Sequence, residues 1–61
     1  MVPDGFLDGN PIELKPNTTS GIAAGQSQLQ GYMKAIGSDY GFLYLYNTDG
    51  TYNVMVLTAG G

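Results

Sequence analysis

The sequence contains no cysteine and no histidine, and only two of its 61 residues, Lys15 and Lys34, are positively charged. Without cysteine the chain forms no disulfide, and without histidine as well it offers no Cys/His zinc site. Five acids against two bases give a net charge of −3, which argues against a broad electrostatic footprint for nucleic acid. The absence of cysteine also fits a reducing compartment such as the cytoplasm.

Long apolar runs are absent as well. No segment approaches the roughly 18–20 apolar residues that a membrane-spanning helix needs, and no charged stretch followed by an apolar one opens the chain as in a signal peptide. We therefore expect no membrane partner. A length of 61 residues allows one domain, 1–61, whose core contributes only about 3–5 kcal/mol. Self-association, a bound metal or a further part of a larger protein would have to reinforce it.

The remaining pattern predicts four strands and one helix in the order β-β-α-β-β. "VPDGFL" and "PIELK" are typical of short strands on either side of "DGN", and "FLYLYN" and "TYNVMVL" flank "TDG". Residues 19–37 predict a helix, with Ser20 as its N-cap and Thr18 or Thr19 as alternatives. Five residues follow helical spacing and should pack on the sheet: Ile22, Gln26, Leu29, Met33 and Ile36.

An Asp-Gly pair marks the turn of the first hairpin. Asp8-Gly9 favours a two-residue type I′ turn, because both central residues need positive φ. In that register Leu7 pairs with Asn10, and counting back places Asp4 opposite Glu13. Directly opposed side chains share a face, with Cβ atoms roughly 4.5–5.5 Å apart. Like charges in such a pair are destabilising unless a divalent cation neutralises them.

A longer loop would change this arrangement. With three residues, 8–10, in the loop, the register shifts by one and Asp4 moves to the other face of the hairpin. Lys15 lies two residues beyond Glu13 and therefore shares its face. The sequence predicts a metal site beside this lysine only if the turn has two residues.

The residues of this hairpin resemble a known signature. Pro3-Asp4 followed by Glu13-Leu14-Lys15 is similar to the PD-(D/E)xK motif of the restriction-endonuclease-like nuclease superfamily. The resemblance implies that Asp4, Glu13 and Lys15 are catalytic. It implies Mg²⁺ or Mn²⁺ as the cofactor, held by the two carboxylates and the backbone carbonyl of Leu14, since hard cations take oxygen ligands. Lys15 would orient the attacking water and stabilise charge on the phosphate.

The helix adds a second part to the resemblance. Gln28 and Tyr32 are four residues apart and share one helix face. A Gln-x-x-x-Tyr helix after the Glu-x-Lys strand is the subsidiary motif of several nuclease subfamilies, where the two residues lie beside the metal site and position DNA or the lysine. The run "ELKPNTTSGIAAGQSQLQGY", residues 13–32, is similar to the nuclease domains at the C-termini of bacterial polymorphic toxins.

The resemblance implies an α/β (α+β) fold with a mixed sheet, a restriction-endonuclease-like core that lacks the usual N-terminal helix and first strand. It implies a metal-dependent phosphodiesterase, a DNA endonuclease-like core of a bacterial toxin or prophage protein that acts in the cytoplasm. The alternative is a catalytically inert nuclease-fold remnant or a self-associating α/β interaction module. Because cations are scarce, we expect weak cleavage unless further segments hold the flanking phosphates.

The second hairpin is apolar on both faces. With Asp49-Gly50 as a two-residue loop, Tyr46 pairs with Asn53 and Tyr44 with Met55. One helix can cover only one of the two faces, and an apolar sheet face needs cover. We therefore expect a homodimer or higher oligomer, formed through the other face or through a sheet edge. Stacking of the tyrosines on bases is a further possibility.

Overall fold

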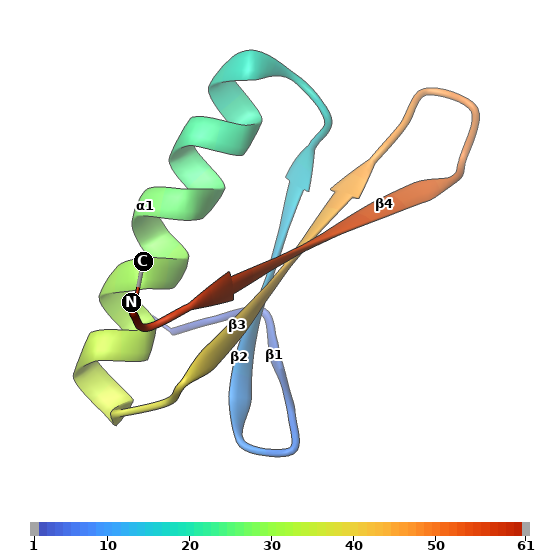
Figure 1. Cartoon of the computed structure of the whole chain (residues 1–61). Coiled ribbons are helices and arrows are strands. Elements are labelled where there is room, and N and C mark those ends of the chain that lie inside the picture. The colour runs from blue at the N-terminus through green and yellow to red at the C-terminus, as the bar shows by residue number, and fades with distance from the viewer. Residues whose placement is uncertain (1, 61) are drawn as a thin grey trace.

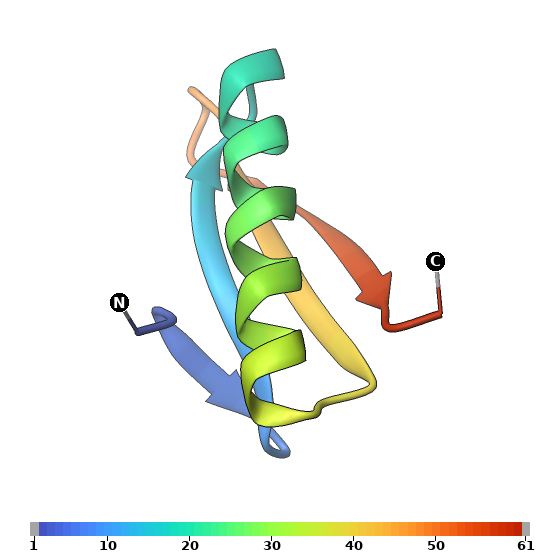
Figure 2. The same cartoon turned by 90° about the vertical axis from the view of Figure 1, so that its left-hand side faces the viewer.

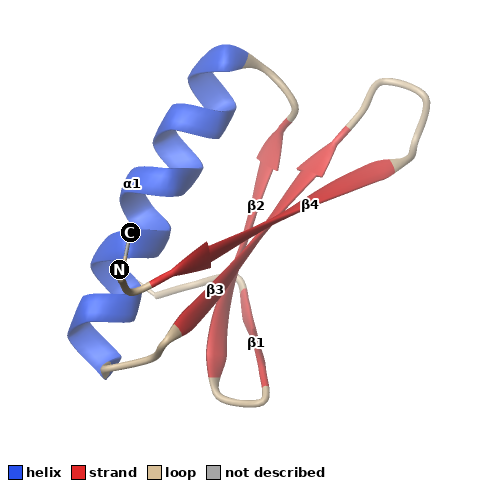
Figure 3. Cartoon of the chain, in the orientation of Figure 1, coloured by secondary structure: helices blue, strands red, loops and turns tan. Residues whose placement is uncertain are grey.

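A four-stranded mixed sheet forms one layer of the protein, and a helix covers one of its faces (Figure 1, Figure 3). The computed structural model describes residues 2–60. In chain order the elements are β1 Gly5–Leu7, β2 Asn10–Pro16, α1 Thr19–Ile36, β3 Tyr40–Tyr46 and β4 Tyr52–Thr58. This order confirms the predicted β-β-α-β-β core. Among the described residues, no helix is long and apolar enough to cross a membrane.

The crossover between β2 and β3 determines the layering of the fold. The strands lie in the order β1-β2-β3-β4. The outer pairs are antiparallel, whereas β2 and β3 are parallel. Parallel neighbours need a long connection, and α1 provides it. The helix lies along β2 and β3, and β4 diverges from it (Figure 2).

The first hairpin has the predicted two-residue turn. Leu7 pairs with Asn10, and Gly5 with Ile12. Asp8 and Gly9 have φ angles of 51° and 81°, which is the backbone conformation that a type I′ turn requires. The predicted two-residue turn and its register are therefore confirmed, but the strand begins only at Gly5, so Asp4 lies before β1 and is not paired with Glu13 in the ladder.

The second hairpin differs from the prediction by one residue. Tyr46 pairs with Tyr52 rather than with Asn53, and Tyr44 pairs with Val54 rather than with Met55. Residues 47–51 form the loop, which is closed by a hydrogen bond from the Asn47 N–H to the Thr51 carbonyl at 2.8 Å.

Side chains of the loop explain this register. Asp49 Oδ1 accepts hydrogen bonds from both the N–H and the hydroxyl of Thr51, at 3.0 and 2.6 Å. The Asn47 amide also donates to the Thr51 hydroxyl at 3.0 Å. Within this loop only Gly50 has a positive φ, of 87°. Asp49 is therefore not the first residue of a type I′ turn, and the longer loop is favoured.

The observed register determines which residues form the core. Leu57 lies opposite Gly41 and Met55 opposite Leu43, so both face the helix. The neighbours Val54 and Val56 then lie on the far face, where they are 51% and 55% exposed. The buried apolar residues come from α1, β3 and β4: Leu29, Met33, Leu43, Leu45 and Leu57.

Glycines as well as apolar side chains form the contact face of α1. Leu29 and Met33 are buried and Ile22 packs against the core as predicted, but Ile36 is 50% exposed. The residues buried one and two turns before Leu29 are Gly25 and Gly21. A hydrophobic pattern does not detect glycine, so these two positions were missed, and the prediction is wrong at Ile36.

The N-cap of α1 is Thr18, one of the two alternatives, and the preference for Ser20 is wrong. Thr18 has an extended backbone, with φ −136° and ψ 162°, and its Oγ1 accepts a hydrogen bond from the Gly21 N–H at 3.0 Å. Such a bond satisfies one of the free N–H groups of the first turn. At the other end Gly37, with φ 72°, terminates the helix, as is typical of a C-terminal glycine.

Candidate active site

Asp4 is anchored to the edge of β2 by its backbone and by its side chain. Its N–H donates to the Ile12 carbonyl at 3.0 Å, and its Oδ2 accepts from the Leu14 N–H at 2.8 Å. Asp4 thus lies just before β1, outside the strand pairing, and its carboxylate is directed toward the Leu14 N–H at the edge of β2. The side chain itself is exposed.

Glu13 is the one buried charged side chain among residues 2–60, at 4% exposure. It lies in the middle of β2, on the face that α1 covers. Burial, followed by the hydrogen bond with the Asp4 carboxyl and the charge of that group, raises the pKa of Glu13 from 4.5 to about 7. At neutral pH this carboxyl is therefore near the midpoint of its titration, and a bound cation would favour its ionised form.

The two acids behave as a pair that shares one proton. The hydrogen bond with Glu13 and the Leu14 N–H lower the pKa of Asp4. The two pKa values move in opposite directions because Glu13 is buried and keeps the proton, whereas Asp4 is exposed and keeps the charge. The positive charge of Lys15 favours the ionised form of both acids.

Tyr32 ties the segment before β1 to the helix. Its hydroxyl donates to the Val2 carbonyl at 3.1 Å. Desolvation raises the pKa of Tyr32, and so do the nearby charges of Glu13 and Asp4. Gln28 lies one turn earlier on the same flank of α1 and is half-buried. Asp4, Glu13, Lys15 and Tyr32 are thus brought to one region, Gln28 lies one turn before Tyr32 on the helix, and the roles of all five remain predictions.

The oxygen atoms in this region fit a hard divalent cation. The carboxylates of Asp4 and Glu13 are in contact, and a cation between them would replace the shared proton. The Leu14 N–H points to the Asp4 edge of β2, and in a strand the carbonyl of a residue points to the same side as its N–H. Residues 2–60 hold no cluster of three acid, histidine or cysteine side chains, so carbonyl, water or phosphate oxygens would complete the coordination, as Mg²⁺ tolerates.

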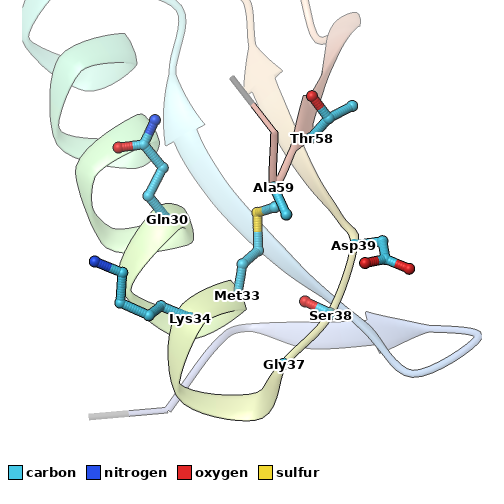
Figure 4. A pocket seen from close by; sticks show the side chains of 8 residues that line it. All are labelled: Gln30, Met33, Lys34, Gly37, Ser38, Asp39, Thr58 and Ala59. Atoms are coloured by element: carbon cyan, nitrogen blue, oxygen red, sulfur yellow. The ribbon is translucent and has the colours of Figure 1, made fainter.

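Two cavities lie away from these residues. One, of about 430 Å³, is on the opposite flank of α1, between the end of the helix and β4 (Figure 4). Gln30, Met33 and Lys34 line it from the helix, and Ser38 and Asp39 from the following loop. The other, of about 300 Å³, lies where β2 and β3 end. Neither cavity is lined by a candidate catalytic residue.

An acid before β1, a Glu-x-Lys sequence on β2 and a Gln-x-x-x-Tyr sequence on the crossover helix together define a restriction-endonuclease-like core. The chain belongs to a toxin family of this class, because the family model described as Restriction endonuclease fold toxin 9 matches residues 5–52. No curated protein and no solved structure matches the chain. The matched segment includes Glu13, Lys15, Gln28 and Tyr32, but it begins one residue after Asp4.

Proposed function

We propose that the chain is a metal-dependent phosphodiesterase, the catalytic core of a toxin that hydrolyses DNA as an endonuclease. In this proposal residues 1–61 form a single small domain. The observation that carries it is the buried Glu13 carboxyl against Asp4 and beside Lys15, in a member of a restriction endonuclease fold toxin family.

The roles follow from the chemistry of these groups. Asp4, Glu13 and the Leu14 carbonyl would hold Mg²⁺ or Mn²⁺, which would supply a water molecule of lowered pKa and offset charge on the phosphate. Lys15 orients the attacking water and donates hydrogen bonds to the phosphate oxygens, for which its ammonium has three N–H groups. Burial of Glu13 supports this assignment, since an unneutralised buried carboxylate is costly.

Gln28 and Tyr32 position the substrate and the site. Gln28 is half-buried one helical turn before Tyr32, and in this proposal its amide contacts a phosphate or the lysine. The Tyr32 hydroxyl already donates to Val2, which supports a part in holding the Asp4 segment in place. With Lys34 on the opposite flank of α1, Lys15 is the cation available to the scissile phosphate, so weak cleavage by this chain is expected.

The protein forms a homodimer or higher oligomer in this proposal, and its site of action is the cytoplasm. The far face of the sheet supports the first point, since Leu14, Tyr46, Tyr52, Val54 and Val56 are all more than 40% exposed there. The lack of cysteine supports the second, because reducing compartments keep no structural disulfides.

Cleavage of supercoiled plasmid and of single-stranded DNA in the presence of Mg²⁺ or Mn²⁺ tests the proposal. We expect slow cleavage that EDTA stops and Glu13→Ala abolishes. Asp39→Asn changes an acid in the loop after α1, at the cavity on the opposite flank of the helix, and should cleave like the wild type. A folded, metal-binding chain without cleavage would identify an inert nuclease-fold remnant instead. Cleavage that survives Glu13→Ala would contradict the assigned site.

A further inference from the structure

We infer that Gly25 is a positioning residue for Lys15, because the missing side chain at this point of α1 leaves the space that the lysine stem occupies. The inference rests on the proposed function, in which Lys15 acts on the attacking water and the phosphate. It adds a residue that neither the sequence motif nor the acid pair identifies.

The space around Gly25 is narrow. Gly25 is buried on the face of α1 that packs on the sheet. A Cβ atom added there would lie 3.0 Å from Lys15 Cγ and 3.0 Å from Leu43 Cδ2, and it would collide with Leu43 Cδ1. Ordinary contacts of a Cβ begin at 3.4 Å. Any side chain at position 25 must therefore displace Lys15, Leu43 or both.

Lys15 is the group that can move without disturbing the core, whereas relief of the collision at Leu43 Cδ1 also requires a shift of Leu43 or of the helix. Leu43 is fully buried, at 0% exposure, and packs in the centre of the core, where close packing leaves no room for a new rotamer. Lys15 is half-buried and has a flexible stem. Three bonds separate Cγ of Lys15 from its amine nitrogen, so a rotation that moves Cγ slightly moves the amine by a larger distance. A methyl group at position 25 thus redirects the charge of Lys15 from the acid pair.

The helix contains a matched control position. Gly31 lies on the same helix, is exposed, and a Cβ there would meet nothing within 4 Å. Gly25→Ala and Gly31→Ala therefore make the same chemical change and raise helix propensity equally. Only the methyl group added at position 25 contacts Lys15 and Leu43.

The first measurement separates rate from metal binding. Gly25→Ala should lower the cleavage rate about tenfold to a hundredfold, the scale that a misplacement of about 1 Å can cost. Its affinity for Mn²⁺ should stay that of the wild type, since Lys15 is not a ligand. Gly31→Ala should change neither value. A wild-type rate in Gly25→Ala, or a joint loss of rate and metal affinity, would overturn the inference.

A second variant separates Lys15 from Leu43. Leu43→Val removes both Cδ atoms, so in the Gly25→Ala background it relieves the collision with residue 43 and leaves that with Lys15. The double variant should be slower than Leu43→Val alone by the same factor by which Gly25→Ala is slower than the wild type. Recovery of the rate would assign the effect to core packing and overturn the inference. If Gly25→Ala alone does not fold, this pair carries the test.

A readout without catalysis distinguishes the inference from the proposed function. Lys15 and Lys34 are the two lysines of the chain, so NMR of the side-chain amines gives one signal for each. The Lys15 signal should shift in Gly25→Ala but not in Gly31→Ala, and Lys34, on the other flank of α1, serves as the internal reference. An unchanged Lys15 signal overturns the inference. Absence of cleavage in the wild type refutes only the proposed function.

Discussion

Glu13 is buried between sheet and helix, whereas its partner Asp4 is exposed. Burial, above all, raises the pKa of Glu13 to about 7, whereas the hydrogen bonds with Glu13 and with the Leu14 N–H lower the pKa of Asp4. Without bound metal, ionisation of Glu13 therefore opposes folding, whereas ionisation of Asp4 supports it.

Stability in EDTA should therefore fall as the pH rises from 4.5 to about 7, because the unfolded chain loses the Glu13 proton first. The rise in pKa corresponds to about 3 kcal/mol, at about 1.36 kcal/mol for each tenfold change in proton affinity. As the pH drops below 3.8, stability should also fall, because Asp4 becomes protonated. Urea unfolding at several pH values measures this dependence. The stability of Glu13→Gln should not decrease above pH 4.5. Stability that increases from pH 5 to 7 would contradict the burial of Glu13.

Lys15→Ala should abolish cleavage and leave Mn²⁺ affinity nearly intact, because the amine acts on water and phosphate rather than on the cation. Lys34→Ala is the matched control, since it removes the same charge on the opposite flank of α1. Cleavage assays and Mn²⁺ titration of both variants make the comparison. Loss of metal binding together with cleavage in Lys15→Ala would show that the lysine supports the structure instead.

At the scale of elements, the site depends on how α1 holds the segment before β1. The hydrogen bond from the Tyr32 hydroxyl to the Val2 carbonyl joins the two, and Asp4 lies two residues farther on. Helix and hairpin therefore determine together where the first carboxylate lies.

Tyr32→Phe should weaken Mn²⁺ binding about two- to threefold, since it removes one exposed hydrogen bond worth about 0.5 kcal/mol. Global stability in urea should change little, because the ring keeps its packing. Amide NMR should show shifts at Val2 and Asp4 and none in β4. Tyr40→Phe, which changes an exposed tyrosine at the start of β3, is the control. Unchanged signals of Val2 and Asp4 in Tyr32→Phe would contradict the anchoring role.

The two hairpins show how far local sequence predicts these elements. Asp8-Gly9 and Asp49-Gly50 are the same dipeptide, but only the first forms a type I′ turn. In the second, the side chains of Asn47 and Thr51 close a longer loop, and such bonds across several residues are not visible in a dipeptide rule. The neighbourhood of the two acids was predictable from the first turn, whereas the contacts that hold Asp4, to Leu14 and through Val2 to Tyr32, were not.

Contacts between elements were less predictable. Gly25 does not appear in any hydrophobic pattern, although it determines how closely α1 approaches Lys15 and Leu43. The burial of Glu13 likewise arises only once the helix covers β2. The sequence therefore indicates which residues form the site, whereas the solvation that controls their protonation requires the packed structure.

At the scale of the whole molecule, one face of the sheet is left without cover. The observed register places Val54 and Val56 on that face, and Leu45 in the core at 4% exposure. Tyr44 and Tyr52 add an edge-to-face ring contact there, with centroids 6.3 Å apart. An apolar surface of this kind favours self-association.

Val54→Lys should therefore dissociate the assembly, and it should lower stability if folding and association are coupled. Ala24→Lys adds the same charge at an exposed position of α1 and should leave the assembly intact. Sedimentation equilibrium over a wide concentration range measures both variants and the wild type. A well-folded wild-type monomer of 6.4 kDa at micromolar concentration would refute the proposed oligomer.

The most direct test of the metal site is a titration of the ¹⁵N-labelled chain with Mg²⁺ and then Mn²⁺, followed by amide NMR at pH 7. We predict that Mg²⁺ shifts the signals of residues 4 and 13–15 and that Mn²⁺ broadens the same signals first. Glu13→Gln should remove both effects, and Asp49→Asn, in the loop between β3 and β4, should keep them. If residues 4 and 13–15 do not respond to millimolar metal, or respond equally in Glu13→Gln, the acid pair is not a metal site.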